Sequence, residues 1–164
     1  MYKTYATKNE YIEYMLEKYA DMVYRLAISR TRDKDNGEDV FQEVFLRLSK
    51  NLPDFESEEH EKAWLIRVTI NCSKNLLNSK WNRCVDSLET ELTEEDIKMD
   101  SIYYDVLRLP QKYRTVIHLF YYENLPIKEI SRILNTKETT IKTWLMRGRK
   151  KLKEMLEGGE KDDK

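Results

Sequence analysis

The chain has 164 residues, which is enough for one domain or two small ones. Its composition is 40% hydrophobic and 36% charged, with four glycines and three prolines, which is typical of a soluble, mostly helical protein with modest cores. The net charge of −1 argues against an evenly spread nucleic-acid-binding surface, so any such surface must come from locally concentrated charge.

The cysteine and hydropathy patterns place limits on the protein's location. Cys72 and Cys84 form no CxxC motif and have no histidine cluster near them, so we predict neither a disulfide framework nor a zinc site, and a reducing cytoplasm as the location. No apolar run approaches the length of a membrane span, and the first residues lack a signal-peptide core. We therefore expect no membrane insertion.

Apolar residues at helical spacing predict two helices in the first part of the chain. The polar residues 30–37 separate them, and Asp35 or Asn36 can cap the second helix. The apolar face of the first helix comprises Ile12, Met15, Leu16, Tyr19, Val23, Leu26 and Ala27, and that of the second Val40, Phe41, Val44, Phe45 and Leu48. The second helix then presents Asp39, Gln42, Glu43 and Arg47 outward as a compact, mainly acidic patch. Such a patch can also be ordinary solvent-exposed helix surface, and the pattern alone favours that simpler interpretation.

A third helix is predicted from about residue 57 to 79. Its apolar face comprises Trp64, Leu65, Val68, Cys72 and Leu76, and another side gathers Arg67, Asn71, Lys74, Asn75 and Asn78. Residues 62–83 hold five basic residues and no acids. Because asparagine is a poor helix former, its repeated use here requires a reason. Hydrogen bonds to exposed bases, with Trp64 and Trp81 available for stacking, are one explanation, and a helix that frays near a domain boundary, with Trp64 in the core, is the other.

The composition changes sharply after the third helix. Residues 86–105 contain eight acids and one lysine, and the first part of this stretch has few apolar residues. We therefore predict a flexible acidic linker at residues 84–101. Order is expected to resume near Ile102, with Val106 and Leu109 leading to Pro110. A further helix follows, whose predicted core face is Tyr113, Val116, Ile117, Phe120 and Tyr121.

Residues 125–153 have the layout of a helix-turn-helix. Pro126 suits the first position of a helix whose apolar face is Ile127, Ile130, Ile133 and Leu134. Asn135 and Thr136 interrupt this period and predict a turn. A second apolar run then follows with Ile141, Leu145, Leu152 and Met155.

The second helix of this motif carries concentrated positive charge. Residues 137–153 contain seven basic residues and one acid, as expected of a surface that binds phosphate. A solvated amphipathic helix whose basic residues suit a helix C-terminus is the simpler alternative. The candidate DNA-binding residues are Lys137, Thr140, Lys142, Thr143, Met146, Arg147, Arg149 and Lys150.

The predicted fold is therefore all-α, with two small helical domains at residues 8–83 and 102–157 joined by the acidic linker, the second domain being the helix-turn-helix. His60 and His118 are isolated, and we expect His118 at the edge of a core. The chain has no Gly-rich phosphate loop, and its carboxylates lack the Glu-x-x-His spacing of helical metal sites. We therefore expect no catalytic residues, no metal site and no cofactor.

Three sequence segments resemble the extracytoplasmic-function (ECF) class of bacterial RNA polymerase sigma factors. They are EDVFQEVFLRL (38–48), AWLIRVTINCSKNLL (63–77) and the motif LPQKYRTVIHLFYYENLPIKEISRIL (109–134) with TIKTWLMRGRKKLKEML (140–156). The resemblance covers roughly residues 14–156, in the right order. It implies a non-enzymatic promoter-specificity subunit whose partners are core RNA polymerase, through its beta and beta-prime subunits, and promoter DNA. Many relatives are held inactive by an anti-sigma factor, so such a partner is also expected.

The resemblance assigns roles to particular residues. Asp39, Gln42 and Glu43 are expected to bind the clamp coiled coil of the largest polymerase subunit. The proximal promoter element is expected to meet Trp64, Arg67, Asn71, Lys74 and Asn75, with the two asparagines facing flipped bases of the non-template strand. The upstream element is expected to be read as duplex by the candidate DNA-binding residues from Lys137 to Lys150.

Five positions depart from the family pattern. Asn135 and Thr139 stand where glycine is usual, Lys137 where serine is common, Trp144 where a basic residue is usual, and Phe120 where some members place a DNA-contacting arginine. These changes leave the predicted fold intact, but they bear on the upstream sequence preference and can exchange phosphate contacts for stacking or packing.

Two alternative functions remain open at this point. A stand-alone helix-turn-helix regulator would bind duplex operators tightly, typically as a dimer, and would leave the asparagine-rich basic helix unexplained. A helical adaptor that binds only proteins would show no salt-dependent affinity for DNA.

Overall fold

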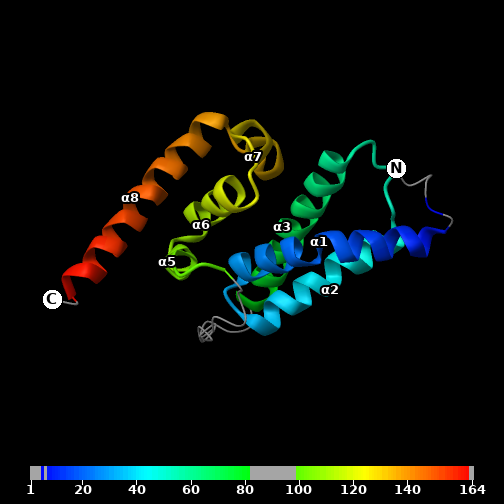
Figure 1. The fold of residues 1–164 in the computed structure, drawn as a ribbon, viewed down its shortest axis with the longest axis horizontal. Helices are drawn as coiled ribbons and strands as arrows, with labels where there is room; N and C mark the ends of the chain where they lie inside the picture. Colours follow the sequence, from blue (N-terminus) through cyan, green and yellow to red (C-terminus); the bar gives the residue numbers. More distant parts are fainter. Residues whose placement is uncertain (1–4, 6, 82–98, 163–164) are drawn as a thin grey trace. The chain divides into compact units, whose positions relative to one another are not determined.

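The computed structural model describes Tyr5, residues 7–81 and residues 99–162, and these residues form helices and connecting turns with no β-strand among them (Figure 1). The all-α prediction is therefore confirmed. The chain divides into two compact units, Met1–Thr93 and Glu94–Lys164. Most of the predicted acidic linker, residues 84–98, lies outside the described residues. None of the described helices is both long and apolar enough to cross a membrane.

The first unit is built from three long helices, α1 (Lys8–Thr31), α2 (Lys34–Lys50) and α3 (Glu58–Trp81), each of which packs against the other two (Figure 1). Their buried faces follow the predicted apolar spacing, since residues such as Val23, Leu26, Val44 and Leu48 are almost completely buried. Leu16 is an exception, because it is 40% exposed despite its place in the predicted core. Phe41 and Phe45 are only partly buried, and their rings lie 4.9 Å apart.

The start of α2 differs from the prediction. Asp33, and not Asp35 or Asn36, is the N-cap, and its carboxylate accepts a hydrogen bond of 3.2 Å from the backbone N–H of Asn36. The α1 helix ends at Thr31, and its C-cap residue, Arg32, has a left-handed backbone with φ 56°. Only one residue therefore separates the end of α1 from the cap of α2, which makes this connection tighter than the polar stretch suggested.

The second unit contains α5 (Ile102–Leu107), α6 (Gln111–Ile117), the π-helix η2 (His118–Tyr122), α7 (Ile127–Leu134) and α8 (Glu138–Asp162). The single helix predicted around Tyr113–Tyr121 is thus an α-helical turn that widens into a π-helix. Tyr113, Val116 and Ile117 are buried as predicted, but Phe120 is only half-buried and Tyr121 is 45% exposed. The last helix, α8, continues through Gly158 to Asp162.

His118 lies in the centre of this unit and not at the core edge as predicted. It is completely buried, with the Tyr103 hydroxyl hydrogen-bonded to Nδ1 and the Glu123 carboxylate 3.1 Å from Nε2. Because both ring nitrogens have partners, the imidazole can be buried without an unsatisfied polar atom. The wide turn of η2, in which the Glu123 N–H donates to the His118 carbonyl, keeps the two residues adjacent.

The helix-turn-helix is confirmed in its central feature. Asn135 ends α7 in the left-handed conformation, with φ 51° and ψ 50°, and the N–H of Thr136 donates to the Ser131 carbonyl across the turn. Pro126 is the N-cap of α7 and not its first helical residue, because its ψ of 154° is extended. Ile130, Ile133, Ile141 and Leu145 are buried between the two helices and the rest of the unit.

The left-handed backbone at Asn135 predicts a specific response to substitution. Asn135→Gly should change the free energy of unfolding by less than about 1 kcal/mol, and Asn135→Val should lower it by about 1–2 kcal/mol, because a β-branched residue is strained at positive φ. Urea unfolding followed by far-UV circular dichroism would measure both. Asn51→Val is the matched control, since Asn51 ends α2 with φ −133°. An equal cost at the two positions would contradict the prediction.

Candidate nucleic-acid interface and partner-binding faces

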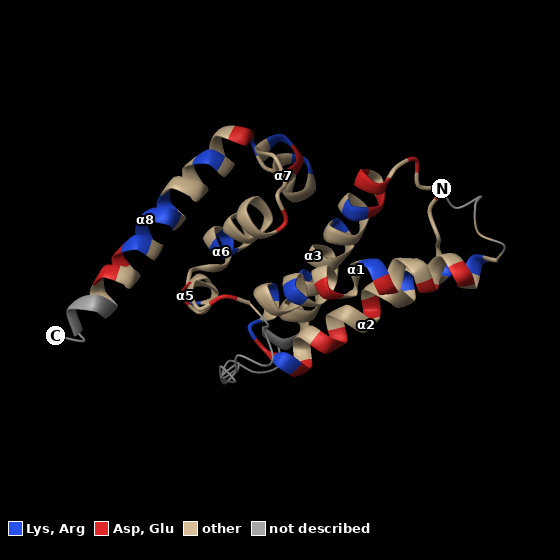
Figure 2. Cartoon of the chain, viewed as in Figure 1, with Lys and Arg blue, Asp and Glu red and all other residues tan. Residues whose placement is uncertain are grey.

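The exposed face of α2 carries the predicted acidic patch. Asp39, Gln42 and Glu43 are all exposed, and Figure 2 shows acidic residues along this helix. The Glu43 carboxylate accepts a hydrogen bond of 3.1 Å from Nε of Arg47 one turn later, an exposed pair that contributes little to stability. The negative charge of Glu43, which follows Gln42 in the chain, is therefore partly neutralised.

Sequence reasoning missed one residue of this face. Leu46 is 52% exposed and lies one helical turn after Gln42 and Glu43, so it extends the same surface. Its spacing was the available signal, because a leucine at this position cannot share the buried stripe of Val40, Val44 and Leu48. We call Asp39, Gln42, Glu43 and Leu46 the α2 face.

The predicted polar side of α3 is present as one exposed surface. Arg67, Asn71, Lys74 and Asn75 are exposed and recur at intervals of three or four residues, so they project from the same side of the helix. We call these four residues the α3 face. The helix continues to Trp81, which contradicts the fraying alternative for Asn71, Asn75 and Asn78, whereas Asn82 lies outside the described residues.

Trp64 sits beside the α3 face in a partly buried position. Its ring meets that of Phe55 edge-on, with the centroids 5.8 Å apart, and Phe55 itself is almost completely buried. One side of the indole is therefore fixed by the core, while the rest of it stays accessible.

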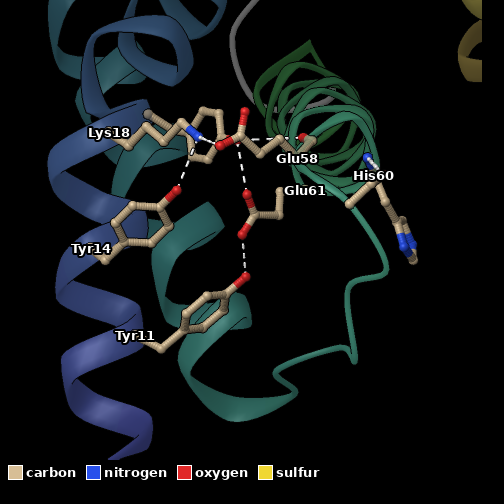
Figure 3. A network of polar contacts seen from close by, with 8 residues as sticks. Tyr11, Tyr14, Lys18, Glu58, His60 and Glu61 are labelled. Atoms are coloured by element: carbon tan, nitrogen blue, oxygen red, sulfur yellow. Dashed lines mark hydrogen bonds and ion pairs between the residues drawn. The ribbon is translucent and has the colours of Figure 1, made fainter. Parts of the chain in front are cut away.

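A buried polar network anchors the start of α3 to α1 (Figure 3). The carboxylate of Glu61 is completely buried and accepts hydrogen bonds from the hydroxyl of Tyr11 and, at 3.1 Å, from that of Tyr19. Burial, reinforced by this carboxylate, raises the pKa of both tyrosines well above the usual range, so the phenols remain protonated donors. Sequence reasoning missed Glu61, because it stands among other acids in a first helical turn, where acids are common.

A surface ion pair lies at the solvent-exposed end of this network. Nζ of Lys18 lies 2.8 Å from Oε1 of Glu58 and donates a hydrogen bond of 3.0 Å to the Tyr14 hydroxyl (Figure 3). Burial lowers the pKa of Lys18, but the bonds to Glu58 and Tyr14 outweigh this effect and raise it above the ordinary value. Three side chains of α1, those of Tyr11, Lys18 and Tyr19, thus contact the first turn of α3.

The polar side of α8 holds the predicted recognition residues. Lys142, Met146, Arg147 and Lys150 are exposed, Thr140 and Thr143 are half-buried, and Lys137 immediately precedes the helix. Figure 2 shows basic residues distributed along α8. The buried Ile141 and Leu145 fix the rotation of the helix, so this polar side is directed away from the core.

Arg149 is partly engaged within the unit. Its Nη1 donates a hydrogen bond of 3.0 Å to the hydroxyl of Tyr121, which lies in η2. The two residues border a cavity of about 230 Å³, which is lined by Ile102, Val106, Ile117, Tyr121, Tyr122, Arg149 and Leu152. Burial, followed by the nearby Asp100 carboxylate, raises the pKa of Tyr122 to about 12, so the Tyr122 phenol stays uncharged.

The described residues contain no group of three or more His, Cys, Asp or Glu side chains that could hold a metal ion. Cys72 is a buried free thiol, and burial raises its pKa, which disfavours the reactive thiolate.

Comparison with known proteins identifies the family. Residues 15–83 match the family of sigma-70 region 2, and residues 106–152 match that of sigma-70 region 4. Over 162 residues the chain is 30% identical to the ECF RNA polymerase sigma factor SigW of Bacillus subtilis (strain 168), a match that covers 87% of each chain. The chain belongs to the ECF sigma factors. This sigma factor is therefore a transcription initiation factor and not an enzyme, a stand-alone regulator or a protein-only adaptor.

Other relatives agree with this family and fold. The ECF sigma factor SigM of Bacillus subtilis (strain 168) is 28% identical, with 93% of this chain and 99% of SigM covered. The sigma factor RpoE of Bartonella quintana, solved with the anti-sigma factor NepR, has a TM-score of 0.74 at 20% identity, covering 88% of this chain and 96% of RpoE. CnrH, solved with the cytosolic domain of CnrY, has a TM-score of 0.66 at 17% identity, covering 93% of this chain and 92% of CnrH.

The Glu61 network predicts a measurable loss of stability. Tyr11→Phe/Tyr19→Phe should lower the free energy of unfolding by at least about 1–3 kcal/mol, because the buried carboxylate loses its donors. Adding Glu61→Leu to that double variant should recover much of the loss, because no unpaired charge then remains. Tyr14→Phe, at the exposed end of the network, is the control and should change stability by no more than about 0.5 kcal/mol. Urea unfolding would rank the variants, and a double variant as stable as Tyr14→Phe would refute this role of Glu61.

Proposed function

We propose that this sigma factor divides its work among three faces. The α2 face binds core RNA polymerase, the α3 face opens and reads the proximal promoter element, and α8 reads the upstream element as duplex. The observation that carries the proposal is that three helices of one ECF sigma factor expose three chemically different surfaces. We further propose that residues 8–83 and 102–157 act as separate binding domains joined by residues 84–101.

The composition of the α2 face suits a protein partner. Stable protein interfaces combine a central apolar residue that becomes fully buried with a polar rim. Leu46 supplies the apolar centre, and Asp39, Gln42 and Glu43 supply the rim, which fits a coiled coil with basic and amide side chains. This arrangement supports a contact with the clamp coiled coil of the beta-prime subunit.

The α3 face suits single-stranded DNA. An asparagine amide offers a donor and an acceptor together, so Asn71 and Asn75 can pair with the edge of a base that has left the stack. Arg67 and Lys74 on the same surface can neutralise the adjoining phosphates. The accessible part of Trp64 provides a ring for stacking, and its fixed contact with Phe55 means that little side-chain freedom is lost on binding.

The surface of α8 suits the major groove of duplex DNA. As the second helix of a helix-turn-helix, it would enter the groove with its N-terminal part, where Thr140, Thr143 and Met146 can reach base edges. Lys137, Lys142, Arg147, Arg149 and Lys150 surround them and would contact phosphates or guanine. The upstream element would therefore be read while the DNA remains paired.

We also propose that an anti-sigma factor regulates this protein. The support is that RpoE and CnrH, which share its fold, are solved in complexes with NepR and the cytosolic domain of CnrY, respectively. Such a partner would have to cover at least one of the three faces to prevent initiation. The protein would act in the cytoplasm, where core polymerase and promoter DNA are found.

The α2 face is tested by a core-binding experiment. Asp39→Ala/Gln42→Ala should weaken binding of core polymerase at least about 10-fold, because the variant removes a carboxylate and an amide, and losing a hydrogen bond to a charged group typically costs about 1.5–3 kcal/mol. A pull-down with purified core, followed by run-off transcription on a genomic promoter pool, would measure it. Asn9→Ala/Glu13→Ala removes one amide and one acid from the exposed side of α1 and should bind normally. Equal core binding by both double variants would show that the α2 face is not the docking site.

The α3 face is tested by separating DNA binding from DNA opening. Asn71→Ala/Asn75→Ala should leave formation of the closed complex unchanged and reduce promoter opening about 10- to 100-fold, because a base edge read by a side-chain amide is worth about 1–3 kcal/mol. Fluorescence of 2-aminopurine placed in the proximal element reports opening directly. Asn9→Ala is the control. If opening proceeds at the wild-type rate in the double variant, another surface reads the melted strand.

A further inference from the structure

The second unit brings α6 unusually close to α8. At Gly148, an added Cβ would lie 2.7 Å from Cδ1 of Ile117 and 3.2 Å from Cβ of Tyr113. Both distances are shorter than ordinary contacts, so a side chain at position 148 would force the Ile117 side chain or the two helices to shift. The part of α6 around Tyr113 is consequently held against the part of α8 around Gly148.

The close packing of α6 on α8 places one charged residue, Lys112, beside α8. Its Nζ lies 6.0 Å from the centroid of the Trp144 ring and 5.2 Å from that of Tyr113. Lys112 is exposed, Trp144 is half-buried, and no carboxylate among the residues that the structure describes forms an ion pair with Lys112. The ammonium is therefore held over an aromatic surface while its charge remains available to an anion.

The position of Trp144 places this charge on the flank of α8 that bears other candidate DNA contacts. Thr140 lies one turn before Trp144 and Arg147 nearly one turn after it, so the three residues share a flank. When a recognition helix lies in the major groove, its tip meets base edges and its flanks run beside the phosphate backbones. Trp144 lies one turn beyond the N-terminal tip that carries Thr140, so a cation held over its ring is in position to meet phosphate.

We propose that Lys112, held over Trp144, is a phosphate-binding residue of the upstream-element interface. The inference rests on the proposed role of α8. Trp144 stands where members of the family usually carry a basic residue, and in this chain a lysine from the neighbouring helix restores a positive charge at that place. Trp144 positions the lysine, and Gly148 permits the approach that brings the two together.

The decisive measurement is the salt dependence of promoter binding. The full chain, assembled with core polymerase, would be titrated with duplex DNA that carries the upstream element at several potassium chloride concentrations. Lys112→Ala should weaken binding and reduce the slope of log K against log salt by about 1, the change expected when one phosphate contact is lost. Lys112→Arg should retain the slope. Lys8→Ala, which removes an exposed lysine of α1, should also retain it.

Two further features distinguish a phosphate contact from a structural lysine. The loss in Lys112→Ala should be the same for promoters with different upstream sequences, because phosphate contacts carry no sequence information. In a Trp144→Ala background, Lys112→Ala should cost less than in the wild type, because the lysine is no longer held in place. A wild-type slope in Lys112→Ala would overturn the proposal, as would equal costs in the two backgrounds.

A parallel variant separates this inference from the proposed function of α8. If Arg147→Ala lowers the slope while Lys112→Ala does not, α8 binds the upstream element without Lys112, and only this inference fails. If neither variant changes the slope, α8 is not the DNA-binding helix, and the proposed function of this face fails with it.

Discussion

The buried carboxylate of Glu61 is the interaction on which the first unit depends most directly. It belongs to the first turn of α3, yet its hydrogen-bond donors, Tyr11 and Tyr19, come from α1. A buried carboxylate tolerates few arrangements, because any shift that removes a donor leaves an unpaired charge away from water. The network therefore fixes where α3 starts and how it is rotated. Because a helix is stiff, that rotation also determines the direction in which Asn71 and Asn75 project two to four turns later.

The second unit also depends on a buried polar group with satisfied hydrogen bonds, in this case a histidine. His118 is buried with a partner on each ring nitrogen, and the π-helix around it keeps Glu123 adjacent. Buried polar groups of this kind restrict a small core to one arrangement, because alternative packings leave them unsatisfied. The close approach of α6 and α8 at Gly148 adds a steric restriction. Together these features give α8 a defined position relative to the rest of the helix-turn-helix.

The positive and negative charges of this protein are numerous, and they lie on different surfaces. The net charge of −1 results from 29 basic and 30 acidic residues. The α2 face carries two acids, whereas the α3 face carries one arginine, one lysine and two asparagines. Basic residues lie along α8 (Figure 2). A protein that must bind both a polymerase and DNA benefits from this separation, because each partner is attracted to a different surface and repelled from the others. The proposed roles of the three faces are consistent with that electrostatic division.

The sequence by itself determined the elements of this fold. Periodic apolar residues predicted α1, α2, α3, α7 and the recognition helix, and Asn135 predicted the turn, because periodicity and turn chemistry are local properties. They also showed that Asp39, Asn71 and Arg147 would face solvent. The tertiary structure alone decided which polar groups are buried and what they meet: Glu61 against Tyr11, His118 between Tyr103 and Glu123, and Lys112 over Trp144. Spacing assigns a side chain to a face of its own helix, but the opposing partner lies 5 to 50 residues away in the chain, and only packing brings the two together.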